Sequence, residues 1–142
     1  MGDADGQLRA AGDLVLKTKS AWTRIEPADG LRILVARFRG HGMPTSRYDV
    51  WMASLGPSEQ TLRAMQKGSL SWARFAKQYR EELFLDGPID KKSRTIKNHG
   101  QKFTLRLLKR LAQKGNVTLL CHCAEDEEHC HRHLLRALIA RQ

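Results

Sequence analysis

The segment Val117–Cys121 constrains the fold most, because it holds five uncharged residues, four of them apolar, between polar neighbours. A short apolar run of this kind is typical of a strand buried in a parallel sheet. An acidic loop follows at 125–128, and the chain from there to Ala140 places Leu135 and Leu138 among the inward positions of a helix. We therefore predict a buried strand that leads through a loop into a final helix.

The rest of the chain repeats this alternation of strands and helices. Branched residues favour strands at Leu14–Lys19 and Leu31–Phe38, and a glycine-rich loop follows the second strand. A helix is predicted over Ser58–Met65 with Ser58 as its N-cap, and apolar residues at helical spacing, Trp72, Phe75, Tyr79 and Leu83, predict a core-packed helix over Ser71–Leu85. The segment Tyr48–Leu55 fits either a strand or a short helix. Such an alternation predicts an α/β fold with an at least partly parallel sheet.

The length of 142 residues fits one domain. Residues 1–13 are small and polar, with acids and glycines, which predicts a flexible tail before a single α/β domain over 14–142. The tail lacks the basic start and apolar stretch of a secretory signal, and no apolar run approaches membrane-spanning length. We therefore expect a cytoplasmic protein with no membrane partner.

Positive charge is the strongest bias of the composition. The chain has 25 lysines and arginines against 15 acids, which gives a net charge of +10. Such a chain attracts polyanions such as nucleic acid, although the same charge also fits a role in solubility alone. The bias is strongest over Lys91–Lys114, where nine residues are basic and none is acidic.

The second half of this basic segment predicts an amphipathic helix that ends at Gly115. Its expected apolar stripe consists of Phe103, Leu107, Leu108 and Leu111. The other side carries the residues that we predict to contact nucleic acid, which are Arg106, Lys109 and Arg110.

All three cysteines fall in one short segment, at Cys121, Cys123 and Cys130. An odd number of closely spaced cysteines does not make a disulfide framework, so reduced thiols or metal ligands fit better. The segment follows the end of a predicted strand, where open α/β sheets bind ligands, and precedes a helix N-terminus, which favours anions. We therefore expect the specific chemistry between Cys121 and Arg132.

Three kinds of chemistry are open for this segment. Zinc accepts thiolates and imidazoles, so the cysteines and one histidine complete a ligand set, although Cys121 and Cys123 are closer in sequence than in the usual C-x-x-C knuckle. Arg132, near the helix start, is suited to clamp a phosphate. Cys130 stands between two histidines at a helix start, which favours a nucleophilic thiolate, but the glycines and arginine of a phosphatase loop do not follow Cys121 or Cys123.

Four stretches of the chain form a recognisable combination of motifs. They are D-G-L-R-I-L-V-A-R at 29–37, L-G-P-S at 55–58, F-A-K-Q-Y-R-E-E-L at 75–83, and L-L-C with D-E-E-H-C-H-R within 119–132. The combination resembles the bacterial and archaeal family of the domain of unknown function 488. That family has tryptophan-proline where this chain has Phe38–Gly42, and His122 and Cys123 are additional here.

The resemblance implies an α/β, Rossmann-like three-layer sandwich with a mainly parallel sheet, and the family's biochemical role is unsettled. Within this fold we predict one site. Its ligand-binding residues are Arg37, Cys121 and Arg132, and its catalytic residues are Cys130 and His131. Tyr48 and Tyr79 are further candidates for polar contacts.

The functional hypothesis is an anionic ligand, phosphate-bearing or nucleotide-like, that binds where the strand ends and the last helix begins. The protein then acts as a small-ligand binder or as an enzyme. We predict no cofactor for it, and zinc is the alternative. The competing hypothesis is an accessory protein that binds nucleic acid through the basic face within Lys91–Lys114.

Overall fold

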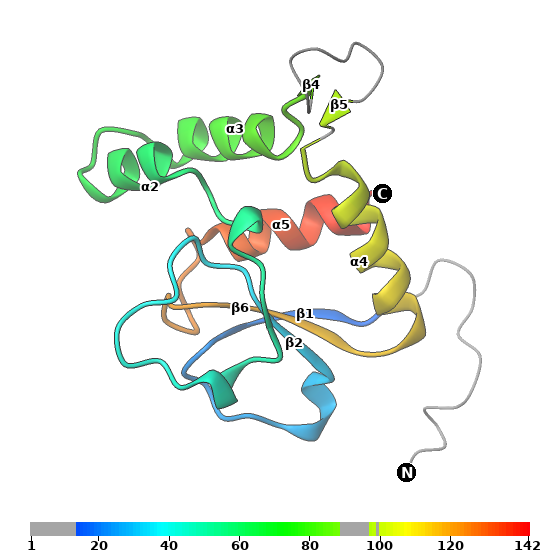
Figure 1. Ribbon diagram of the computed structural model, residues 1–142. Coiled ribbons are helices and arrows are strands. Elements are labelled where there is room, and N and C mark those ends of the chain that lie inside the picture. The colour runs from blue at the N-terminus through cyan, green and yellow to red at the C-terminus, as the bar shows by residue number, and fades with distance from the viewer. Residues whose placement is uncertain (1–13, 89–96, 99) are drawn as a thin grey trace.

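The computed structural model describes residues 14–88, 97–98 and 100–142. The predicted flexible tail at 1–13 and most of the basic connection before Lys97 lie outside the described residues. The central sheet has four parallel strands in the order β1–β6–β2–β3 (Figure 1). These strands are β1 Leu16–Ser20, β2 Leu31–Leu34, β3 Val50–Trp51 and β6 Val117–Cys121. The buried strand predicted at 117–121 is therefore confirmed, and it lies between β1 and β2.

The α-helices of the described residues are α2 Glu59–Gln66, α3 Trp72–Leu83, α4 Lys102–Lys114 and α5 His131–Ala140. In Figure 1, α3, α4 and α5 lie over one face of the sheet. A separate antiparallel pair, β4 Gly87–Pro88 and β5 Lys97–Asn98, lies along the chain between α3 and α4. The predicted α/β, Rossmann-like class with a parallel sheet is confirmed. No helix in the described part of the chain is long and apolar enough to cross a membrane.

The main core lies between the sheet and these helices. Alternate strand residues, among them Ile33 and Leu119, point into it and pack with Tyr79, Leu105 and Leu135. The predicted cap by Ser58 is present, because its hydroxyl accepts a hydrogen bond from the first turn of α2, and Ser71 caps α3 in the same way.

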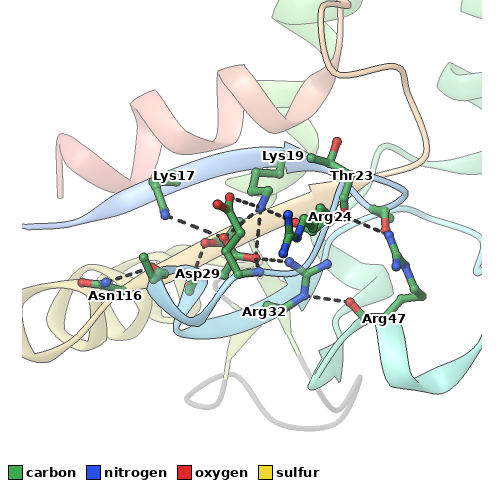
Figure 2. Close-up of polar contacts among 12 residues, drawn as sticks. Lys17, Lys19, Thr23, Arg24, Asp29, Arg32, Arg47 and Asn116 are labelled. Carbon is green, nitrogen blue, oxygen red and sulfur yellow. Dashed lines mark hydrogen bonds and ion pairs between the residues drawn. The ribbon is translucent and has the colours of Figure 1, made fainter. Parts of the chain in front are cut away.

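The opposite face of the sheet carries a cluster of charged side chains (Figure 2). Asp29 has no exposed surface, and Lys19 donates to both of its carboxylate oxygens at 3.0 and 3.1 Å. Arg32 also donates to this carboxylate, and Lys17 lies 3.7 Å away from it. Asp29 ends the 3₁₀ helix Pro27–Asp29, so these ion pairs hold the connection between β1 and β2 against the sheet.

Two segments after β1 differ from the elements predicted for them. The strand predicted over Leu31–Phe38 ends at Leu34, because its neighbour β3 ends at Trp51 and leaves no partner beyond that point on this side. The segment Tyr48–Leu55, which fitted either a strand or a helix, contains both: β3 and the 3₁₀ helix Ala53–Leu55.

The apolar stripe predicted for α4 is wrong in three of its four positions. Leu108 is buried, but Phe103, Leu107 and Leu111 are 55%, 58% and 38% exposed. The buried face consists instead of Leu105, Leu108 and Ala112. The predicted stripe and the observed buried face are about a quarter-turn to a half-turn apart on the helix. Both carry apolar residues, so apolar spacing alone does not identify the face that packs on the core.

Candidate functional site

A pocket of about 340 Å³ opens where β2 and β6 end and α5 begins. Three chain segments supply its polar groups: Ala36–Phe38 after β2, Cys121–Cys123 at the end of β6, and His129–His131 at the start of α5. Residues from α2 and α3 supply an apolar wall that includes Leu62, Met65, Trp72 and Phe75. The pocket thus occupies the carboxyl edge of the parallel sheet, where ligands bind in open α/β folds.

The inner end of the pocket is a cluster of cysteine and histidine side chains. Cys121 is the last residue of β6, Cys130 is the N-cap of α5, and His131 is its first residue. One atom from each of these three residues lies within 4.8 Å of the others, and all three residues are buried. The Cys121 Sγ atom is 4.0 Å from Nδ1 of His131. A strand end and a helix start therefore bring together groups that are ten residues apart.

Hydrogen bonding fixes the imidazole of His131. Its Nε2 atom lies 2.8 Å from the carbonyl oxygen of Val35, which only accepts, so Nε2 carries the proton and Nδ1 faces Cys121 with a free lone pair. Burial lowers the pKa of His131, which keeps the ring neutral at physiological pH. The edge of the ring also packs against Tyr79, at 5.5 Å between ring centroids.

The three thiols share their protons unequally. Hydrogen bonds from Cys123 and Cys130 lower the pKa of Cys121 to about 3. The same bonds raise the pKa of Cys130 and of Cys123, since each of these thiols keeps its proton in order to donate to Cys121. Hydrogen bonding within the cluster therefore favours ionisation of Cys121 over that of Cys123 and Cys130.

Arg132 lies in a different place from the predicted one. It was predicted to bind the ligand, but its side chain has no exposed surface and does not line the pocket. Its guanidinium donates to the carbonyls of Ala124 and Glu125 at 3.0 and 3.1 Å, and Nη1 lies 3.7 Å from Sγ of Cys130. Arg132 therefore positions the loop and the cysteine, and does not face a ligand.

Arg37 does line the pocket, although it follows β2 by three residues and does not end it. It is the one lysine or arginine among the described residues that line this pocket. The neighbouring loop is held to the end of β6 by His122, whose Nε2 atom is 2.9 Å from the carbonyl of Phe38. Gly40 permits this approach, because a Cβ atom there would lie 2.7 Å from the His122 ring.

The two tyrosines do not reach the pocket. Tyr79 is buried in the main core and donates a hydrogen bond to the carbonyl of Leu55 at 2.5 Å. Tyr48 packs against a second cluster of buried residues that includes Leu34 and Leu120, and it does not line the pocket. Trp72, whose helical spacing indicates core packing, also contributes to the pocket. The Trp72 ring stacks on His129 at 4.7 Å between centroids, and both residues line the pocket. Helical spacing gave Trp72 the same pattern as its core neighbours, so no sequence signal separated them.

The predicted nucleic-acid-binding residues gather at a different place. Arg106, Lys109 and Arg110 of α4 line a surface depression together with Arg141. Arg141 follows the C-terminal end of α5, whereas His131 is at its start. A ten-residue helix is about 15 Å long, so the two sites are separated by the length of α5.

A family model described as the active DUF488-N3 subclade matches residues 16–142. The match covers nearly the whole described chain and confirms the resemblance drawn from the motifs. Comparison with curated proteins and with solved structures gave no significant match.

Proposed function

Because the chain belongs to the DUF488 family, in the subclade described as active, we propose that the pocket at the carboxyl edge of the sheet is its functional site. The proposed ligand is a small anion with a flat apolar part, such as a nucleotide or another phosphate-bearing compound. The observation that carries this proposal is the meeting of Arg37, Cys121, Cys130 and His131 in one pocket.

The lining of the pocket supports this choice of ligand. Ligand sites range from roughly 300 to 1,000 Å³, and a few polar groups in an apolar lining are their usual composition. The wall includes the stacked rings of His129, Trp72 and Phe75, and this aromatic surface suits a flat apolar group such as a nucleobase. Arg37 supplies a permanent positive charge, and the N-terminal end of α5 adds the positive end of a helix dipole.

The groups available for chemistry are the Cys121 thiolate, the Cys130 thiol and the neutral His131 imidazole. They lie on the pocket side of the sheet, beside the position proposed for the ligand. Arg132 belongs to this site as a positioning residue, since it holds the loop and Cys130 from behind.

Equilibrium binding by isothermal titration calorimetry tests the proposal. We expect adenosine monophosphate to bind more tightly than adenosine, and Arg37→Ala to weaken the monophosphate by about tenfold or more, the effect of one hydrogen bond to a charged group. Arg39→Ala is the matched control, because Arg39 is exposed and does not line the pocket. Equal affinities for the wild type and Arg37→Ala, or equal losses in both variants, would contradict the proposal.

A second candidate function is the binding of a nucleic acid by the basic depression. The observation in its favour is that Arg106, Lys109 and Arg110 share this depression with Arg141, which the sequence alone did not connect to them. Several cations in one concave surface suit the closely spaced phosphates of a nucleic-acid backbone. The two candidates use separate residues, so variants distinguish them.

A further inference from the structure

We propose that Cys121, Cys130 and His131 bind a zinc ion at the inner end of the pocket, with the fourth coordination position open toward the pocket. This inference concerns the site of the proposed function and would give that site a Lewis-acidic centre for an anionic ligand. It rests on the positions of the ligand atoms, the orientation of the imidazole and the surroundings of the two sulfurs.

The three ligand atoms lie close to the spacing that zinc requires. Tetrahedral zinc binds sulfur at about 2.3 Å and imidazole nitrogen at about 2.0 Å, which sets neighbouring ligand atoms roughly 3.5 to 3.8 Å apart. In the structure, Sγ of Cys121 is 4.0 Å from Nδ1 of His131, and Sγ of Cys130 completes a triangle within 4.8 Å. Contraction by less than about 1 Å on each edge therefore produces zinc geometry.

The imidazole of His131 is oriented as in a metal ligand. Histidines that bind metals donate their other ring N–H to a carbonyl or carboxylate, which fixes the tautomer and aims the lone pair. Nε2 of His131 makes this bond to the carbonyl of Val35 at 2.8 Å, and Nδ1 faces the sulfur of Cys121. The Val35 carbonyl only accepts, so the ring proton stays on Nε2 and the lone pair of Nδ1 points into the cluster.

The surroundings of the two sulfurs also suit metal-bound thiolates. Cys130 receives an N–H from the buried guanidinium of Arg132 at 3.7 Å, and such hydrogen bonds to ligand thiolates are common around metals. Zinc binding releases the thiol proton of Cys130, and the divalent ion then compensates two buried thiolates that would otherwise repel each other and be poorly solvated. Arg132, completely buried behind Cys130, then has a definite role as the partner of a metal-bound thiolate.

The open position follows from the number of ligands. Only these three side chains meet the spacing of a metal site among the described residues. Three protein ligands and one exchangeable position are the pattern of catalytic zinc, whereas structural zinc has four protein ligands. Cys121, Cys130 and His131 all line the pocket, so the remaining position faces the proposed ligand. Cys123 is half-buried at the rim and is the residue that would close the site.

The experiment is a metal titration of the full-length chain, kept reduced and stripped of metal with a chelator. We expect one equivalent of Co²⁺ to give thiolate charge-transfer absorption and strong tetrahedral visible bands, and one equivalent of Zn²⁺ to remove them. His41→Ala is the matched control for His131→Ala, because His41 is exposed and does not line the pocket, and it should keep the stoichiometry and the bands. Cys123→Ser tests whether the fourth position is open, and we expect it to keep them as well. Cys130→Ser and His131→Ala should each weaken Co²⁺ binding by about 100-fold or more.

Several results would overturn the inference. A wild-type chain that gives no tetrahedral cobalt spectrum, or that keeps it in both Cys130→Ser and His131→Ala, does not have this site. Loss of the site in Cys123→Ser would show four protein ligands and no open position. If the buried-site variants fail to fold, the wild type alone decides, because bound zinc must raise its melting temperature. Binding of adenosine monophosphate to the metal-free chain is measured separately, so the proposed function and the zinc site can fail independently.

Discussion

Asp29 is a fully buried carboxylate that pairs with two cations, Lys19 and Arg32, on the face of the sheet opposite the main core. Removal of its charge leaves Arg32 buried without a counter-charge and leaves Lys19 only the exposed carboxylate of Glu26, which is strongly unfavourable. We expect Asp29→Asn to lower the free energy of unfolding by about 3 kcal/mol at pH 7 in urea denaturation. Glu26→Gln is the control, since Glu26 pairs with the same Lys19 but its side chain is 60% exposed, and we expect a loss under about 1 kcal/mol. Equal, small losses in both variants would contradict this account of the cluster.

The same residue predicts how stability depends on pH. Burial alone would raise the pKa of Asp29, but hydrogen bonds from the Glu26 amide and from Lys19 more than offset this effect and lower it. A carboxyl whose pKa is lower in the folded state stabilises the fold above its unfolded pKa and loses that contribution as the pH falls below about 4. We therefore expect the difference in unfolding free energy between the wild type and Asp29→Asn to shrink between pH 5 and pH 3, each measured by denaturation, and a constant difference would be contrary evidence.

Single residues also mark the limit of prediction from the sequence. Arg37 was predicted to bind the ligand near the end of the strand expected over Leu31–Phe38, and it does line the pocket. Arg132 was predicted to bind the ligand because it stands near the start of the last helix, yet its guanidinium donates to the loop carbonyls of Ala124 and Glu125 and is buried there. Such enclosure depends on how a loop folds back on a helix, which periodicity along the chain does not encode.

At the scale of elements, α4 has two apolar stripes of which only one is packed. Leu108 is 2% exposed and Leu107 is 58% exposed, although they are adjacent and chemically identical. We expect Leu108→Ala to lower the free energy of unfolding by about 3 kcal/mol, because it leaves a cavity in the core. Leu107→Ala should change it by less than about 0.5 kcal/mol in the same denaturation experiment. A larger loss in Leu107→Ala would restore the stripe predicted from the sequence.

Element order and type were predictable because they depend on local pattern. The strand at 117–121, the serine-capped helices and the parallel class all followed from apolar spacing and caps. The packed face of α4 and the early end of β2 did not, because each is decided by a neighbouring element. The pocket had the same limit: its cysteine and histidine floor was evident in one segment, but its wall from α2 and α3 was not.

At the scale of the whole molecule, the net charge of +10 favours polyanions in general, and the arrangement of the cations decides whether one surface binds them. If the basic depression binds nucleic acid, a triple alanine variant of Arg106, Lys109 and Arg110 should weaken binding and reduce the salt slope by about two to three. Fluorescence anisotropy with a labelled DNA duplex over a range of salt concentrations measures both.

The control removes the same charge from another face. Arg74, Lys77 and Arg80 are exposed on α3, and alanine at all three leaves the depression intact. Equal effects of the two triple variants would indicate a response to net charge alone and would exclude a defined nucleic-acid surface.

The central claim is that the carboxyl edge of the sheet is the functional site, and a nuclear magnetic resonance titration tests it most directly. Adenosine monophosphate added to ¹⁵N-labelled protein should shift the amide signals of residues 36–38, 121–123 and 129–131, which line the pocket. Arg37→Ala should reduce these shifts, and Arg39→Ala should not. Shifts confined to 106–113 and 141–142, or shifts unchanged by Arg37→Ala, would contradict the claim and move the anion-binding site to the basic depression.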